Sequence, residues 1–245
     1  MLKEAIEKIL EVSKPTVYRE GDSWVVVTSA GEAKEYATEK YVPNTLEVYS
    51  LDALVKMVRD EAIDKYEPPF FISVPNHLTV ECKGKAHGYE ERYIRPRYYC
   101  ARATDVPQWD STTKMGFEEM QIAIRTRFQE TPDSVYVLKL LSDITTDGKV
   151  TFSDNGIATS VVTQKGIALH SREMIRPIVK LKPYRTFQEI EQPESQFLIR
   201  VSEGGILLTE ADGGMWKLKA RQTIKEYLEN MFKKEIECGL VVVMI

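Results

Sequence analysis

The sequence has few cysteines and no long hydrophobic run, and these two absences exclude several classes of protein. Its 245 residues hold three cysteines, an odd number at irregular spacing that implies no disulfide framework and suits a reducing cytosol. No stretch approaches the about 18 uninterrupted apolar residues that a membrane-spanning helix needs. Residues 1–12 lack the apolar core and the small-residue cleavage site of a secretory signal. We therefore expect a cytosolic protein that does not engage a membrane.

The sequence also lacks the common catalytic motifs. There is no glycine-rich phosphate loop, no dinucleotide fingerprint, no nucleophile elbow, no zinc-protease helix signature and no EF-hand. The two Gly-Lys pairs, at Gly84 and Gly148, have neither the upstream glycine nor the following hydroxyl residue of a phosphate loop. We therefore predict no catalytic residue, no cofactor and no enzymatic activity.

Composition and charge are those of an ordinary globular protein. Apolar residues make up 43% and charged residues 29% of the chain, which is enough to bury a core. Because the formal net charge is −4, the molecule as a whole repels the phosphate backbone of nucleic acids. A general nucleic-acid coat is therefore disfavoured, whereas binding through a local basic patch stays open.

Helices are predicted where apolar residues recur three or four positions apart. Ser50 is expected to cap the second helix, and Pro132 to end the third. In the third, the central helix, glutamates in the first turn and arginines near the end complement the helix dipole. The predicted helices cover residues 2–13, 51–62, 115–130 and 216–231.

Strands are predicted from short apolar and β-branched runs, with residues 29–40 taken as loop. Residues that tolerate positive φ mark hairpin turns at Asp147-Gly148, Asn155-Gly156 and Gly204-Gly205. The predicted strands cover residues 24–28, 46–49, 70–74, 78–82, 97–103, 135–141, 157–163, 167–170, 178–181, 197–201 and 206–209.

Helices and strands are segregated along the chain and do not alternate, which favours an α+β fold. We expect a mixed, largely antiparallel sheet with one prominent central helix and a C-terminal helix. Residues 1–245 are predicted to form a single domain. The best internal boundary lies near residues 107–116, where loop chemistry would separate residues 1–108 from residues 109–245.

A group of histidines and cysteines could hold zinc. His77, Cys82, His87 and Cys100 are good zinc ligands by type. Structural zinc sites usually pair ligands two to four residues apart, however, and the gaps here are wider. The competing interpretation places both cysteines on strands as small apolar residues, which we prefer. We therefore predict no metal site.

Arginine and tyrosine alternate in one segment. Such a mixture can grip single-stranded nucleic acid, because bases stack on rings while arginines neutralise phosphates. It is also typical of a protein interface, where both residue types are favoured. A solvated strand whose arginines pair with nearby glutamates is the third interpretation. The residues concerned are Arg92, Tyr93, Arg95, Arg97, Tyr98, Tyr99 and Arg102.

Acidic residues and a lone histidine in the second half are given structural interpretations. Asp147 and Asp154 are explained by the glycine turns beside them. Together with Asp143 they resemble a carboxylate site only in their sequence proximity. His170 lies at the end of an apolar run, where a core or edge position is expected.

Residues 240–245 form an uninterrupted apolar run. Leu240, Val241, Val242 and Val243 begin it, and Met244 and Ile245 follow. At about 25 cal/mol per Å² of apolar area, burial of such a strand is worth several kcal/mol. We expect the run to join a sheet, either in the same chain or in a second copy, because an exposed edge of this kind aggregates.

Several patterns of apolar and turn residues recur across roughly residues 50–232. They are Trp109, Phe117-Glu118-Glu119-Met120, Gly156, Pro183-Tyr184-Arg185-Thr186-Phe187, Phe197-Leu198-Ile199-Arg200-Val201, Gly204-Gly205 and Trp216. In these patterns the chain resembles the YfdQ-like proteins, an uncharacterised family encoded by bacteriophages and prophages. The resemblance implies a phage origin and the cytoplasm of a bacterial host, and it supplies no catalytic or binding residue.

The order of elements is also similar to the layout of capsid and encapsulin shell subunits, which favours closed self-assembly without defining a function. We expect a non-enzymatic phage or prophage protein that forms a symmetric homo-oligomer, with a ring, a shell or part of a virion as the forms considered. The Arg/Tyr segment and residues 240–243 are its predicted contacts. The alternatives are a module that binds single-stranded nucleic acid or a host protein, and an unrecognised hydrolase or metal enzyme.

Overall fold

The computed structural model describes residues 3–5, 14, 16–20, 23–27, 32–37, 44–86, 95–107, 109, 111–146, 150–154, 159–165, 168–202 and 205–245. The protein is mixed α+β with mostly antiparallel strands, as predicted. It divides into two compact units, one of Met1–Asn44 with Ala86–Pro96 and the other of Thr45–Lys85 with Arg97–Ile245. The expected boundary near residues 107–116 lies inside the second unit. Of the helix predicted for residues 2–13, only residues 3–5 are described, and they are helical.

The first unit contains a three-stranded antiparallel sheet. The strands are β1 (Thr16–Glu20), β2 (Ser23–Val27) and β3 (Ala33–Ala37), in the order β1-β2-β3. The strand predicted at residues 24–28 is confirmed as β2, whose Val25 is buried. The loop predicted for residues 29–40 is wrong in part, because β3 lies within it. This polar segment is a strand because it pairs with β2. Its sequence has no apolar alternation from which the pairing could be predicted.

A five-stranded sheet forms one half of the second unit. Its order is β15-β5-β6-β7-β4, and β15 and β4, the two edge strands, are parallel to their neighbours. The hairpin predicted from residues 70–82 is confirmed as β5 and β6. The strands are β4 (Leu46–Val48), β5 (Phe70–Asn76), β6 (Thr79–Lys83), β7 (Arg97–Arg102) and β15 (Val241–Met244).

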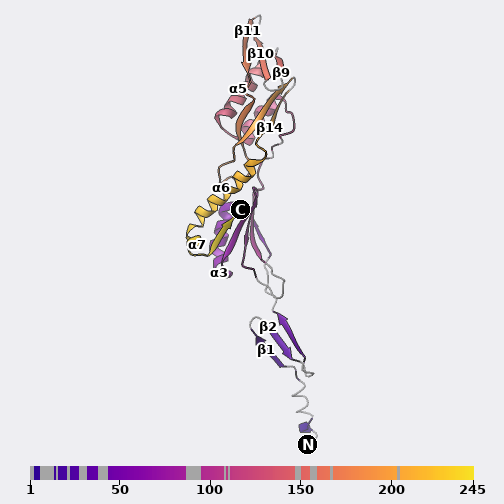
Figure 1. The fold of residues 1–245 in the computed structure, drawn as a ribbon, viewed down its shortest axis with the longest axis vertical. Helices are drawn as coiled ribbons and strands as arrows, with labels where there is room; N and C mark the ends of the chain where they lie inside the picture. The colour runs from indigo at the N-terminus through magenta and orange to yellow at the C-terminus, as the bar shows by residue number, and fades with distance from the viewer. Residues whose placement is uncertain are drawn as a thin grey trace. The chain divides into compact units, whose positions relative to one another are not determined.

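Helices cover one face of this sheet (Figure 1). Ser50 caps the first helix as predicted, because its Oγ accepts a hydrogen bond from the Ala53 N–H at 3.1 Å. That helix runs from α2 (Leu51–Met57) through a π-helical turn (Val58–Ala62) into α3 (Ile63–Lys65). The predicted C-terminal helix is confirmed as α6 (Met215–Met231), and α7 (Lys233–Glu237) follows it. The shared core includes Leu54, Val58, Phe70, Ile72, Cys82, Ile224, Leu228 and Phe232.

The other half of the second unit packs two helices on a four-stranded sheet of order β14-β13-β12-β8. The central helix is confirmed as α4 (Phe117–Arg127), and the hairpin predicted from residues 197–209 is confirmed as β13 and β14. The remaining elements are α5 (Pro132–Thr146), β8 (Phe128–Gln129), β12 (Ile178–Pro183), β13 (Ser195–Ser202) and β14 (Gly205–Glu210).

The strand predicted at residues 135–141 is wrong, because these residues lie in α5. Pro132 does not end the central helix but begins this second one, at a position where its missing N–H costs nothing. The Ser134 N–H donates to Thr131 Oγ1 at 3.0 Å, and the Thr131 N–H donates to Ser134 Oγ at 2.8 Å. This reciprocal cap starts the helix and presents the apolar run to the core with helical spacing.

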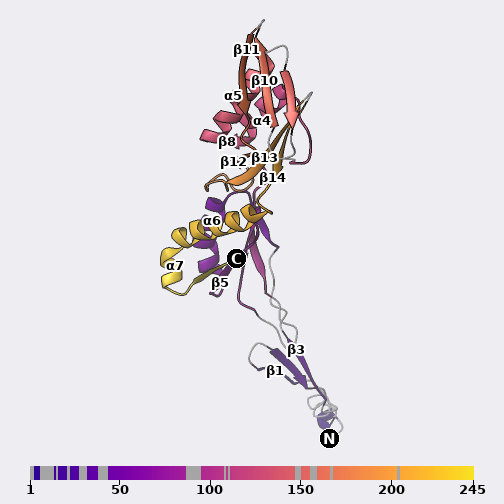
Figure 2. The same cartoon turned by 45° about the horizontal axis from the view of Figure 1, so that its top comes forward.

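A third antiparallel sheet follows α5. It consists of β9 (Val150–Asp154), β10 (Thr159–Lys165) and β11 (Ala168–Met174), in the order β11-β10-β9 (Figure 2). The predicted turn dipeptides Asp147-Gly148 and Asn155-Gly156 lie outside the described residues. No helix in the described part of the chain is both long and apolar enough to cross a bilayer.

Gly205, the first residue of β14 in the four-stranded sheet, lies very close to the Met115 backbone. Met115 and Ile206 exchange backbone hydrogen bonds at 3.0 and 2.9 Å beside it. A Cβ added at Gly205 would overlap the Met115 carbonyl oxygen, and its φ of +158° disfavours any other residue.

We expect Gly205→Ala to lower the free energy of unfolding by about 2–4 kcal/mol, because backbone strain and steric overlap act together. Gly213→Ala is the control, because Gly213 has φ +63° but open space around its Cβ position. That change should cost about 1 kcal/mol through strain alone. Equal losses in urea-induced unfolding of the two variants would contradict the steric explanation.

Candidate interaction surface

The face of the five-stranded sheet opposite the helices carries three of the side chains that the sequence marked as contacts, Arg97, Arg102 and Val242. Directly opposed residues on neighbouring strands share a face. One row therefore contains Val242, Phe71, Lys83 and Arg97, and the next contains Met244, Ser73, Glu81, Cys100 and Glu47. Arg102 lies beyond them, opposite Thr79. We call these residues the open face, because no helix of the described chain lies on this side (Figure 1).

The arginines on the open face are paired. Glu81 accepts hydrogen bonds from Arg97 Nη1 at 2.6 Å and Lys83 Nζ at 2.7 Å, while Arg102 Nε lies 3.0 Å from Glu47 Oε1. Burial pushes the pKa of Glu81 upward, but the bonds from Lys83 and Arg97 outweigh it and hold the pKa below its ordinary value. Exposed pairs of this kind add little stability. They do leave the face nearly neutral, which weakens the case for phosphate binding.

Tyr98 and Tyr99, the described tyrosines of the Arg/Tyr segment, are turned away from this face. Tyr98 stacks on Tyr66 with 4.0 Å between ring centroids, and Tyr99 is buried in the core beneath the helices. Burial raises the pKa of both phenols. The rings are therefore not available for stacking on bases. Arg95 is exposed in the first unit. Arg92 and Tyr93 lie outside the described residues.

The sheet separates the two cysteines of the zinc hypothesis. Cys82 points into the helix-covered core, where burial raises its pKa to about 12, while Cys100 lies on the open face. Two ligands on opposite faces of one sheet cannot bind the same ion. His77 lies in the β5–β6 turn, and His87 is outside the described residues. Within the part of the chain that the structure describes, no three potential ligands cluster.

The apolar run at residues 240–245 adds to the chain's own sheet, one of the two alternatives that its sequence left open. β15 pairs with β5, and Val241 is buried with an exposed fraction of 1%. The alternate side chains Val242 and Met244 stay accessible at 42% and 38% exposed, and Ile245, which follows the strand, is 47% exposed. The chain therefore buries only part of the apolar side-chain surface of this run.

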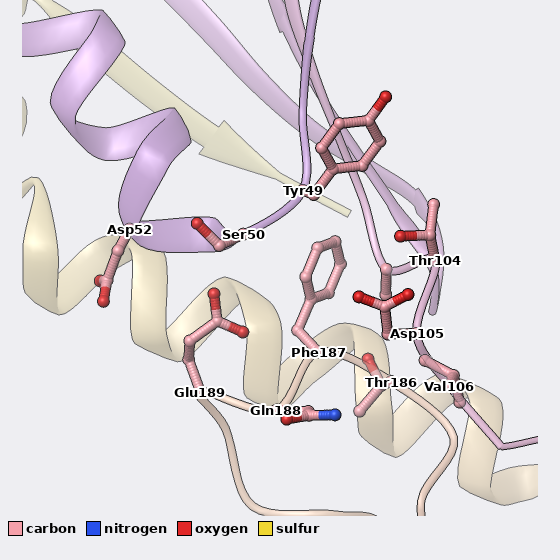
Figure 3. Close-up of a pocket in the computed structure, with 11 residues that line it drawn as sticks. Tyr49, Ser50, Asp52, Thr104, Asp105, Val106, Thr186, Phe187, Gln188 and Glu189 are labelled. Atoms are coloured by element: carbon pink, nitrogen blue, oxygen red, sulfur yellow. The ribbon is translucent and has the colours of Figure 1, made fainter.

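A cavity of about 430 Å³ lies where three segments of the second unit meet (Figure 3). One segment is the start of α2, another is residues 103–106, and the third is residues 186–189. Figure 3 shows Asp105 and Glu189 at the wall with Phe187 between them. The wall contains Tyr49, Ser50, Asp52, Ala103, Thr104, Asp105, Val106, Thr186, Phe187, Gln188 and Glu189.

The polar groups in this cavity hold the fold together. Glu189 Oε1 accepts the Leu51 N–H at 2.7 Å, and Asp52 accepts a hydrogen bond from the Tyr227 hydroxyl of α6. Ser50 is occupied as a helix cap, and Thr186 Oγ1 donates to the His77 carbonyl at 2.5 Å. These hydrogen bonds use Glu189, Asp52, Ser50 and Thr186 for structure, so they give no positive support to a hydroxyl nucleophile paired with a base among the described lining residues.

Among the described residues, the most deeply buried charge is that of Arg185, at the junction of the two halves, and sequence reasoning missed this site. Arg185 lies 4.3 Å from the Trp216 ring centroid, and its Nη2 is 2.8 Å from Glu210 Oε1. Its Nη1 donates to Ser195 Oγ at 3.0 Å, and Ser195 donates in turn to Asp212. Burial lowers the pKa of Arg185, while Glu210 and Asp212 oppose that effect. Arg185 and Trp216 belong to the patterns that carry the family resemblance, but nothing in the sequence indicated that they pack together with Ser195, Glu210 and Asp212.

The acidic residues considered as a catalytic group are not brought together among the described residues. Asp143 is exposed on α5, and Asp147 is outside the described residues. Asp154 ends β9 and His170 lies in β11. These positions give no support to a carboxylate site.

Comparisons with protein-family models, with curated proteins and with solved structures found no match. The resemblance to the YfdQ-like proteins therefore stays a prediction from sequence patterns.

His77 gives the junction a pH dependence. Its ring packs edge-on against Trp216 at 4.7 Å, and burial lowers its pKa below 6.5, with Lys217 and Arg185 adding to the effect. A histidine with a lowered folded-state pKa stabilises the fold above pH 6.5, and this contribution is lost as the pH falls through the folded pKa.

We therefore expect the melting temperature to be lower at about pH 5.5 than at about pH 7.5. Both pH values lie above the range in which carboxylates titrate. His77→Gln should reduce this fall, because glutamine takes up no proton. Thermal unfolding followed by circular dichroism at both pH values measures it. An equal fall in the variant would show that other groups are responsible.

Proposed function

We propose that this is a non-enzymatic protein that associates with copies of itself into a symmetric homo-oligomer. The observation that carries the proposal is the half-exposed apolar edge strand β15, with Val242, Met244 and the following Ile245 accessible. A phage or prophage origin is part of the proposal and depends on the sequence resemblance alone.

The strand β15 itself carries no lysine, no proline and no bulge, three of the features that monomeric proteins use to protect a sheet edge. Such edges usually carry a lysine, a proline, a bulge or a covering loop. Residues 240–245 contain neither charge nor proline, and β15 pairs with β5 without a register shift. The opposite edge, β4, is three residues long, and its Glu47 is paired with Arg102. The β15 edge is therefore the better template for another strand.

The open face extends the same surface across the sheet. Val242 and Met244 lie beside Phe71 and Ser73 at its apolar end, and the paired charges lie at the other end. Apolar area next to satisfied polar pairs is typical of protein interfaces. Nucleic-acid binding is supported less well, because Arg97 and Arg102 are paired with glutamates and the tyrosines are packed inside.

We expect Val242→Lys to weaken self-association, because a lysine on the free edge would place a charge against the partner strand. Val242 is 42% exposed, so its replacement should leave the monomer folded. Ile122→Lys is the matched control, because Ile122 is a β-branched residue, 63% exposed, on α4.

Size-exclusion chromatography with light scattering measures the effect. The wild-type protein and Ile122→Lys should give the same oligomer at micromolar concentration, and Val242→Lys a smaller species with an unchanged circular dichroism spectrum. A monomeric wild-type protein would overturn the proposal.

A further inference from the structure

We infer that the contact is a two-fold one, in which β15 pairs antiparallel with β15 of a second copy and Val243 lies on the axis. This inference depends on the proposed self-association and specifies its partner, its symmetry and its register. It predicts a closed dimer with a sheet that is continuous across both copies, and not a ring or a shell built through this edge.

The direction of the backbone groups along β15 follows from its pairing with β5. The Leu240 carbonyl accepts the Phe70 N–H at 2.8 Å, which places residue 240 among those that face β5. Residues in a strand direct their N–H and C=O alternately to one side and the other. Val242 and Met244 therefore bond β5, and Val241 and Val243 direct their backbone groups to the free edge, as Ile245 would if the strand continues.

These outward groups lack partners in the part of the chain that the structure describes. β15 ends the strand order of its sheet, and no other hydrogen bond joins Val241 or Val243 to a described residue. Unpaired backbone groups beside apolar side chains favour the addition of another strand. A peptide of unrelated sequence could add here too, but this strand offers a partner of equal length and equal apolarity in every other copy.

Symmetry restricts the pairing. When the same edge of two identical subunits meets, the contact is isologous and the two strands run antiparallel. Directly opposed residues in an antiparallel pair share a face. Val242 and Met244 must therefore meet side chains of the partner's open face, which requires the axis to pass through a residue and not between two residues.

Any residue of the run could lie on the axis under this rule, but the central positions Val242 and Val243 bring the most of residues 240–245 into opposition. Hydrogen bonding distinguishes these two registers. With the axis at Val243, Val243 pairs with itself and Val241 pairs with Ile245 of the partner copy, so all outward groups are used. With the axis at Val242, Ile245 lies opposite Gly239, whose φ of +71° takes it out of a strand conformation. The first register is therefore favoured. It places Val242 against Met244 of the partner copy on the open face.

Disulfide cross-linking tests the register in the full-length chain. All variants carry Cys238→Ser, because Cys238 is exposed whereas Cys82 and Cys100 are buried. A hydrogen-bonded antiparallel pair has Cα atoms about 5.5 Å apart, within the range that a disulfide spans. Val243→Cys should therefore give a covalent dimer on mild oxidation. Val242→Cys should not, whereas Val242→Cys with Met244→Cys should cross-link through exposed positions.

The outcomes separate this inference from the proposed function. A wild-type oligomer in which neither Val243→Cys nor the double variant cross-links would overturn the inference and leave self-association standing. Stronger cross-linking of Val242→Cys alone would move the axis and contradict the register. A monomeric wild-type protein would overturn both proposals. The double variant covers the case in which Val243→Cys fails to fold, because both of its positions are on the open face.

Discussion

Burial of only one face of the five-stranded sheet is the constraint on which the rest of the second unit depends. Side chains alternate along each strand, so each residue is assigned either to the core under α2 and α6 or to the open face. Phe70, Ile72 and Val241 fill the core. The same alternation sends Val242 and Arg97 to the other side. A candidate contact surface is therefore a direct consequence of how the core is built.

This alternation also bears on the functional interpretations that the sequence left open. It places Cys82 and Cys100 on opposite faces, which removes the shared zinc site. It divides the Arg/Tyr segment into buried rings and exposed guanidinium groups, and the glutamates of β4 and β6 neutralise two of these groups. What stays accessible and unsatisfied is the edge of β15, where both backbone groups and apolar side chains are available.

The two halves of the second unit are joined by a polar junction. Removing a guanidinium from water is costly unless ion pairing and hydrogen bonds replace its hydration. Arg185 obtains these from Glu210 and Ser195 and packs on Trp216. Trp216 also contacts His77 of the β5–β6 turn. Within the loop at residues 184–192, the Gln192 amide bonds backbone groups of the loop itself, and the Thr186 hydroxyl bonds the His77 carbonyl. These groups therefore hold the loop in place beside the junction.

Much of the fold could be predicted from local signals. The helices at Leu51, Phe117 and Met215 carry apolar stripes, and the β5–β6 hairpin has apolar runs around a turn. Predictions were wrong where a partner decided the outcome. β3 became a strand by pairing with β2, and residues 135–141 became helix because the Thr131 and Ser134 cap begins one there. A short apolar run fits either periodicity, so pattern alone could not decide it.

For the candidate surface, the sequence by itself determined that residues 240–245 must leave water, since six apolar side chains cannot be solvated without a large cost. It also determined which residue types would accompany them. Only the tertiary structure decided that this run pairs with β5, that Val241 and Val243 face the core, and that one edge stays open in the described chain. Those outcomes depend on contacts between residues more than 100 positions apart, such as Val241 with Phe70, and local sequence carries no record of them.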